Sequence, residues 1–239
     1  MIDIHSHIEK ENGVYLLEKL LADMDRFQIQ KRVISDLRVD GIQEGIQQIA
    51  EAVKTYPARL IGCALLNPSL STIIEDTKLA CATPEIQMIE FNSYEHGYAP
   101  DDCPVLNEVF SLIQERKLPV KVFSGIGAKA LPHQWEIYVK RYPDIPFIFL
   151  HMGCFDYGYS CVDIVKRNDN AWIETSNQYE MQILRKAFQQ LPENKILFGS
   201  SYPERFTRNA IEIFDLFPLN KDTRQAYFHD NAKQLLRQG

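Results

Sequence analysis

The chain has 239 residues, of which 45% are hydrophobic and 24% are charged, a composition typical of a globular protein with one large core. The formal net charge of −6 and the lack of a basic cluster argue against a nucleic-acid surface. No apolar run nears the roughly 18 residues of a membrane span, and because His5 and His7 interrupt the opening segment we expect no signal peptide. We therefore expect one domain over residues 1–239, a small-molecule substrate, and neither nucleic acid nor membrane as a partner.

Five cysteines are scattered along the chain without CxxC spacing. Their odd number argues against a complete disulfide framework, so reduced thiols and a cytoplasmic location are expected. The sequence leaves the oligomeric state open, and a homo-oligomer is compatible with it.

Short apolar runs alternate with amphipathic stretches along the chain, a pattern typical of repeated βα units and a parallel sheet. Eight strands are predicted, at residues 2–5, 31–35, 60–66, 87–92, 119–123, 147–151, 171–175 and 195–199. Each strand is followed by a helical pattern. The helical spacing of apolar residues is clearest at residues 15–27, 42–55, 105–115 and 180–190.

Eight βα units favour a compact α/β fold, the (β/α)₈ TIM barrel, for which about 250 residues are typical. The competing architecture is an open doubly wound sheet, which normally has a glycine-rich turn after its first strand. The first strand here leads instead into His5-Ser6-His7-Ile8-Glu9. We therefore expect a single barrel with its active site at the C-terminal ends of the strands.

A His-x-His pair ends the apolar opening run of the chain. Residues two apart on a strand point to the same side, so Asp3, His5 and His7 are expected to share one face. His151 ends the sixth predicted strand, and a barrel would bring it to the same rim. Neutral imidazoles bind zinc, so the three histidines predict one divalent metal ion, for which zinc is expected. The alternative is that His151 only caps a strand.

Several further segments follow in a specific order and spacing. They are Ile2-Asp3-Ile4-His5-Ser6-His7, residues 53–62 leading to Asn67-Pro68, Leu118-Pro119-Val120, His151-Met152-Gly153, Glu174-Thr175-Ser176, Leu197-Phe198-Gly199-Ser200-Ser201-Tyr202-Pro203 and Asn231-Ala232. With these segments nearly the whole chain resembles the amidohydrolase-related metal-dependent hydrolases, which include the aminocarboxymuconate-semialdehyde decarboxylase-like enzymes. The resemblance implies a barrel with one divalent metal ion, usually zinc. Its ligands would be the His-x-His pair, a histidine on strand 6 and an aspartate on strand 8, with a further histidine on strand 5.

The chain departs from this family pattern at two positions. Phe123 stands where the family has histidine on strand 5, and Ser201 stands where it has aspartate after strand 8. A serine hydroxyl is not an effective base near neutral pH without an activating partner. Three neutral histidines still suffice to hold zinc and to lower the pKa of a water to about 7.

Strand parity offers carboxylates that could replace the missing base. With their apolar neighbours packed outward, Glu90 on the fourth strand and Glu174 on the seventh should face the interior, together with Asp3 and Lys121. Glu90, Glu174 and Ser201 are the catalytic candidates, and either glutamate could also bind the metal. The alternative interpretation pairs Glu90 with Lys121 and lets Asp3 and Glu174 accept hydrogen bonds from their neighbours.

Aromatic and polar residues follow the fourth and sixth predicted strands. Tyr94, His96, Phe155 and Tyr157 are predicted to bind the substrate, because such loops lie above the rim of a barrel. The same residues could instead plug the barrel mouth. Cys154 is interpreted as a small buried hydrophobe rather than a metal ligand.

The leading hypothesis is a metal-dependent hydrolase of a small amide, ester or lactone, in which water activated by the metal attacks the carbonyl. A non-oxidative decarboxylase on the same scaffold is the alternative, since the fold does not choose between them. Phe123 and Ser201 also motivate a barrel that has lost catalysis and keeps a binding role. A phosphoesterase with two or three ions would need more ligands than these strand ends supply.

Overall fold

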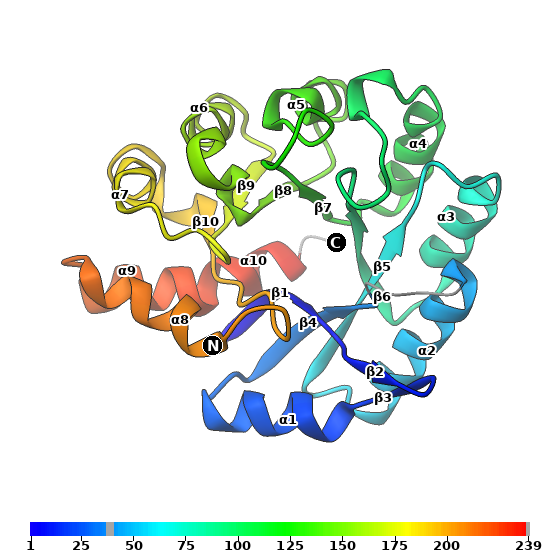
Figure 1. Ribbon diagram of the computed structural model, residues 1–239, viewed down its shortest axis with the longest axis horizontal. Helices are drawn as coiled ribbons and strands as arrows, with labels where there is room; N and C mark the ends of the chain where they lie inside the picture. Colours follow the sequence, from blue (N-terminus) through cyan, green and yellow to red (C-terminus); the bar gives the residue numbers. More distant parts are fainter. Residues whose placement is uncertain (37–40, 238–239) are drawn as a thin grey trace.

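The computed structural model describes residues 1–36 and 41–237. Eight parallel strands form one sheet, and helices surround it (Figure 1). In sheet order the strands are β1 (Ile2–His7), β4 (Lys31–Ser35), β5 (Leu60–Leu66), β6 (Ile86–Phe91), β7 (Val120–Phe123), β8 (Phe147–Leu150), β9 (Ala171–Glu174) and β10 (Ile196–Leu197). The predicted (β/α)₈ barrel is confirmed. The first strand extends further than expected, and the last is shorter.

Helices follow the strands as the amphipathic pattern predicts. They are α1 (Leu17–Arg26), α2 (Ile42–Thr55), α3 (Ile73–Ala82), α4 (Leu106–Arg116), α5 (Pro132–Arg141), α6 (Gly158–Arg167), α7 (Met181–Gln190), α8 (Thr207–Glu212), α9 (Lys221–Gln225) and α10 (Asn231–Arg237). A small hairpin of β2 (Lys10–Glu11) and β3 (Val14–Tyr15) follows β1. No helix within the described residues is long and apolar enough to span a membrane.

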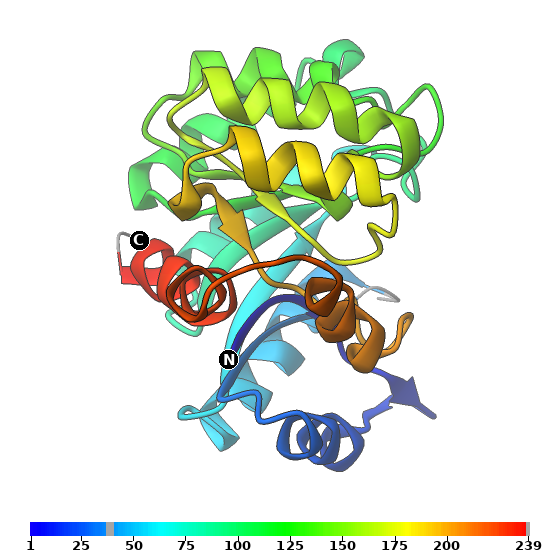
Figure 2. The ribbon, with the colours of Figure 1, turned by 90° about the vertical axis from the view of Figure 1, so that its left-hand side faces the viewer.

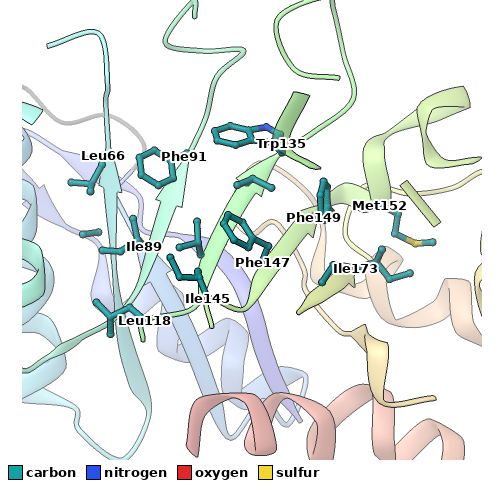
Figure 3. Packing of buried hydrophobic residues seen from close by; sticks show 14 of the residues in the cluster. Leu66, Ile89, Phe91, Leu118, Trp135, Ile145, Phe147, Phe149, Met152 and Ile173 are labelled. Carbon is teal, nitrogen blue, oxygen red and sulfur yellow. The ribbon is translucent and has the colours of Figure 1, made fainter. Parts of the chain in front are cut away.

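Two hydrophobic clusters divide the barrel into layers. The outer cluster lies between strands and helices, where Phe91, Phe147 and Phe149 alternate with inward residues along their strands (Figure 3). Trp135 of α5 packs against Phe91. The inner cluster fills the N-terminal half of the barrel with Ile2, Ile4, Val33, Ile61, Cys63, Met88, Ile148 and Leu197. Ala232 and Leu235 of α10 belong to this inner cluster, and α10 lies across that end of the barrel (Figure 2). Polar side chains therefore gather in the C-terminal half.

The barrel closes between β1 and the segment that follows β10. The backbone N–H groups of Ser200 and Ser201 both donate to the carbonyl oxygen of His5, at 3.2 and 2.9 Å. Two residues further on, the N–H of His7 donates to the carbonyl of Tyr202 at 2.6 Å. The strand that carries the His-x-His pair is thus tied directly to the last strand of the barrel.

An irregularity in β1 changes which side chains face the interior. The register of β1 against β4 shifts between Asp3 and Ser6, as it does at a β-bulge. Ile4 belongs to the inner cluster and the adjacent His5 also points inward, whereas Asp3 bonds Arg32 Nε at 2.9 Å on the helix side. The expectation that Asp3 shares a face with the histidines is therefore wrong, because strict two-residue alternation does not hold across the bulge.

Asp3 anchors the closure of the barrel from outside. Its carboxylate accepts hydrogen bonds from Arg32 Nε and from the Ser200 hydroxyl, the latter at 2.6 Å. Arg32 is fully buried and also pairs with Asp23 of α1 at 2.9 Å. A buried cation that loses a partner is costly, because it has been removed from water.

We expect Asp3→Ala to lower the free energy of unfolding by about 3 kcal/mol, since it leaves the buried guanidinium with one carboxylate. Urea denaturation of the purified variant measures this loss. Arg208→Ala is the matched control, because Arg208 forms an exposed pair with Glu212 at 3.8 Å and should cost at most about 0.5 kcal/mol. Equal losses for the two variants would contradict the anchoring role of Asp3.

Candidate metal centre

Three imidazole rings meet at the C-terminal mouth of the barrel. His5 and His7 come from β1, and His151 opens the 3₁₀ turn η2 (His151–Gly153) directly after β8. The ring centroids are 4.8 Å apart for His5 and His7 and 5.1 Å apart for His5 and His151. All three side chains are buried. The structure thus brings together the three residues predicted as metal ligands.

The ring of His151 is held by a relay of two side chains. The Ser176 hydroxyl donates to Glu174 Oε2 at 2.9 Å, so its oxygen accepts from His151 Nδ1, also at 2.9 Å. The backbone N–H of His151 donates to the same carboxylate at 3.1 Å. Burial lowers the pKa of His151 to about 4. The ring is therefore neutral near pH 7, with its proton on Nδ1 and a free lone pair on Nε2.

His7 lies between two carboxylates. Its Nδ1 is 2.9 Å from Glu204 Oε2, and its Nε2 is 3.2 Å from Glu90 Oε1. Burial disfavours the charged ring, but Glu90 and Glu204 outweigh it and raise the pKa of His7 to about 9. Without a metal ion His7 thus carries a proton on each nitrogen, and a cation bound at Nε2 must displace one of them.

Glu90 is the centre of the charged groups inside the barrel. Lys121 Nζ lies 2.8 Å from its Oε2, and the Ser35 hydroxyl donates to the same oxygen at 2.7 Å. Burial opposes ionisation, but Lys121 and His7 hold the pKa of Glu90 well below its usual range. The expected pair of Glu90 with Lys121 is present, and it keeps Glu90 ionised and weak as a base.

His5 provides the test of whether these residues fit a metal ion. Its Nε2 is buried and has no hydrogen-bond partner among the described residues, and burial holds its pKa well below the usual range. Its Nδ1 lies 3.3 Å from Lys121 Nζ, which can only donate, so Nδ1 accepts this hydrogen bond and the ring proton lies on Nε2 when no ion is bound. An ion bound at Nε2 would displace that proton. A neutral buried imidazole with an unpartnered nitrogen suits a divalent ion.

Two overlapping sets of donor atoms surround His5. His5, His7 and Glu90 bring ligand atoms within 4.8 Å of one another, and His5, His151 and Glu174 do the same. Nitrogen and carboxylate donors of this kind suit zinc and also manganese. The residues present therefore fit one divalent ion bound with His5 as the shared ligand.

Glu174 holds His151 in place through hydrogen bonds. Burial raises its pKa to about 7, although hydrogen bonds from His151 N, Ser176 N and the Ser176 hydroxyl act in the opposite direction. These donors occupy both carboxylate oxygens, so the group orients His151 rather than reaching toward the mouth. Gly199 leaves room for it, because a Cβ there would lie 2.1 Å from Glu174 Oε1.

The two positions that depart from the family pattern have different surroundings. Phe123 packs edge-on against His151, with ring centroids 5.3 Å apart, and Tyr94 stacks on Phe123 at 5.8 Å. Ser201 is buried at the closure of the barrel, where its backbone has a φ of 54° and bonds the carbonyl of His5. An aromatic ring therefore fills the place of the strand-5 histidine.

Of the residues predicted to bind substrate, Tyr94 stacks on Phe123, which in turn packs against His151. His96 is half-buried, and its Nδ1 has no hydrogen-bond partner within the described part of the chain. Phe155 and Tyr157 lie in the 3₁₀ turn η3 (Phe155–Tyr157), with exposures of 59% and 40%. Their contact with substrate stays a prediction.

Two residues of the site were not predicted from the sequence. Ser176 binds His151, and Glu204 binds His7. Both follow a barrel strand by a few residues, so chain order alone places them at the rim. Their position in the chain could have indicated this, but nothing in the residue type separates Glu204 from other acidic residues in loops.

A family model described as amidohydrolase matches residues 2–238. The chain belongs to the amidohydrolase family. No curated protein matches the sequence. Solved structures in turn resemble this amidohydrolase closely in fold, although none of those described below exceeds 17% sequence identity.

Three of these structures show the range of related proteins. An uncharacterised TIM-barrel protein from Bordetella bronchiseptica has a TM-score of 0.81 at 15% identity, covering 99% of this chain and 98% of its own. A probable 2-pyrone-4,6-dicarboxylic acid hydrolase from Acinetobacter baumannii, with citric acid bound, has a TM-score of 0.74 at 15% identity and the same coverage. A 5-carboxyvanillate decarboxylase from Novosphingobium aromaticivorans, with bound manganese, has a TM-score of 0.72 at 17% identity, covering 92% and 80%. At these identities the likeness supports the fold alone.

We expect Gly199→Ala to lower the free energy of unfolding by about 1–3 kcal/mol, because the added methyl collides with a carboxylate that three donors hold in place. Urea denaturation measures the effect. Gly41→Ala is the control, since a Cβ there meets nothing within 4 Å and only the preference for Gly over Ala at the N-cap of α2 is lost, which should cost at most about 1 kcal/mol. A Gly199→Ala variant as stable as the control would show that Glu174 moves freely.

Proposed function

We propose that this member of the amidohydrolase family is a metal-dependent hydrolase of a small amide, ester or lactone. The observation that supports it is the meeting of His5, His7 and His151 around the buried, unpartnered Nε2 of His5. Three histidines form a metal site that does not need a carboxylate ligand. We take the ion to be zinc, with manganese as the alternative that a decarboxylase of similar fold contains.

When bound, the ion would polarise the substrate carbonyl and lower the pKa of a water toward neutrality. The protein side chains would supply position and exclusion of solvent. Ser176 and Glu174 keep His151 in one orientation, and Phe123 covers the edge of that ring. Tyr94, stacked on Phe123, offers a flat apolar wall for the substrate.

The proposed catalytic residues differ in what they can do. Glu90 is ionised and faces His5 and His7, so it would accept a hydrogen bond from the attacking water more readily than it would take its proton. Glu174 would act through His151. Ser201 would contribute its hydroxyl at the place where the family has aspartate.

Decarboxylation is a second candidate with an observation in its favour. Breaking a carbon–carboxylate bond releases CO₂ and needs a proton for the carbon, but it requires no base to deprotonate water. The carboxylates of Glu90 and Glu174 are both engaged by buried donors, which suits such a reaction. Several of the solved structures of similar fold are named as decarboxylases.

Metal content tests the proposed centre. We expect wild-type protein expressed with zinc supplied to carry about one ion per chain, and His151→Ala to lose it on dialysis, because one of three ligands is gone. Elemental analysis by mass spectrometry gives the ratio. His229→Ala is the control, because His229 lies beside Ile2 and Lys31 at the N-terminal end of the barrel and bonds Asp230. Wild-type protein free of metal after growth with zinc or manganese would refute the proposal.

An activity screen separates the two reactions. We expect simple esters or lactones to be hydrolysed, with the rate lost on treatment with a chelator and restored by zinc or manganese. Incorporation of ¹⁸O from labelled water into the acid product marks hydrolysis, whereas release of CO₂ from aromatic and unsaturated acids marks decarboxylation. Turnover that survives complete metal removal would contradict a metal-dependent mechanism of either kind.

A further inference from the structure

Glu204 is an acidic residue of the site that the family pattern does not assign. It lies in the segment after β10, three residues beyond Ser201, and its side chain is 33% exposed. Its Oε2 is 2.9 Å from His7 Nδ1. The chain therefore does carry a carboxylate close after the last strand, but this carboxylate contacts a histidine.

We propose that Glu204 is a positioning residue, which keeps the His7 ring turned with its proton on Nδ1 so that Nε2 faces the metal position beside Glu90. This inference rests on the proposed function, because it assigns His7 as a ligand. A carboxylate only accepts hydrogen bonds, so Nδ1 must be the donor in this contact. Nε2 then lies at the opposite edge of the ring, 3.2 Å from Glu90 Oε1.

His151 is held in a similar manner from the neighbouring loop. Its Nδ1 contacts the Ser176 hydroxyl, which donates in turn to Glu174. Two histidines at the mouth therefore have the same ring nitrogen occupied by an acceptor that a carboxylate provides or supports. Metal-binding histidines commonly use such outer partners, and loss of one typically weakens metal affinity about 10–100-fold.

Hydrogen bonds of the next residue, Arg205, hold the backbone at Glu204. Arg205 donates from its backbone N–H to the carbonyl of Ser201 and from Nη1 to the carbonyl of Glu204, both at 2.9 Å. Its Nε donates to Asn177 Oδ1 at 2.9 Å. The segment after β10 is thus linked to the loop after β9, and Glu204 is directed at His7.

Metal affinity of three variants tests the proposal. We expect Glu204→Ala to weaken zinc binding about 10–100-fold, measured by competition with a chromogenic chelator. Glu204→Gln should stay within a few-fold of wild type, because its amide oxygen still accepts from Nδ1. Glu212→Ala is the matched control, since it removes the same charge from α8, where Glu212 pairs with the exposed Arg208. Wild-type affinity in Glu204→Ala would overturn the proposal.

A second measurement needs no metal. The Nδ1–H of His7 should give a downfield ring proton in the NMR spectrum of the metal-free protein, protected from exchange by its bond to Glu204. We expect this proton in wild type and Glu204→Gln and its loss in Glu204→Ala. If wild type binds no metal but shows this pattern, the proposed function fails and the positioning role stands. If the proton is absent from wild type, or persists in Glu204→Ala, the positioning role fails.

Discussion

The carbonyl oxygen of His5 accepts two backbone N–H groups, from Ser200 and Ser201, and the rest of the site depends on this contact. It closes the barrel between the first strand and the segment after the last. It also coincides with the bulge that turns His5 inward immediately after the inward Ile4. The same backbone contacts therefore close the barrel and orient the His-x-His pair toward its interior.

Charge balance is the second constraint on the site. Glu90 and Glu204 carry two negative charges, and Lys121 and doubly protonated His7 carry two positive ones. Buried charges are tolerated only when such partners are present. A divalent ion that replaced one proton of His7 would leave the group with one extra positive charge, which an anionic substrate or hydroxide would neutralise. We expect such a site to bind a cation together with an anion.

Much of the fold was predictable because each strand is a short apolar run between helical patterns. Residues 31–35 and 60–66 were predicted with the observed bounds, since both strands are bordered by polar or turn-forming residues. Parity placed Glu90, Lys121 and Glu174 inside correctly, because β6, β7 and β9 alternate regularly. It failed for Asp3, since a bulge depends on how two strands pair and not on the residues of one strand.

The site was predictable only in part, for a related reason. Histidines at strand ends can be recognised by residue type and spacing, so His5, His7 and His151 could be grouped from the sequence. Glu204 and Ser176 are common residues in loops, and only the folded backbone shows that they reach imidazole nitrogens. The contact that Phe123 makes could also be seen only in the structure, which places its ring against His151.

Binding of one divalent ion by His5, His7 and His151 is what gives this site its proposed chemistry. The most direct test is a crystal structure of protein loaded with zinc or manganese, with anomalous diffraction recorded at the absorption edge of the metal. We expect a single anomalous peak at the mouth of the barrel, within about 2.0–2.3 Å of nitrogen atoms from the three rings. Loaded crystals with no peak there, or with the ion bound elsewhere, would contradict it.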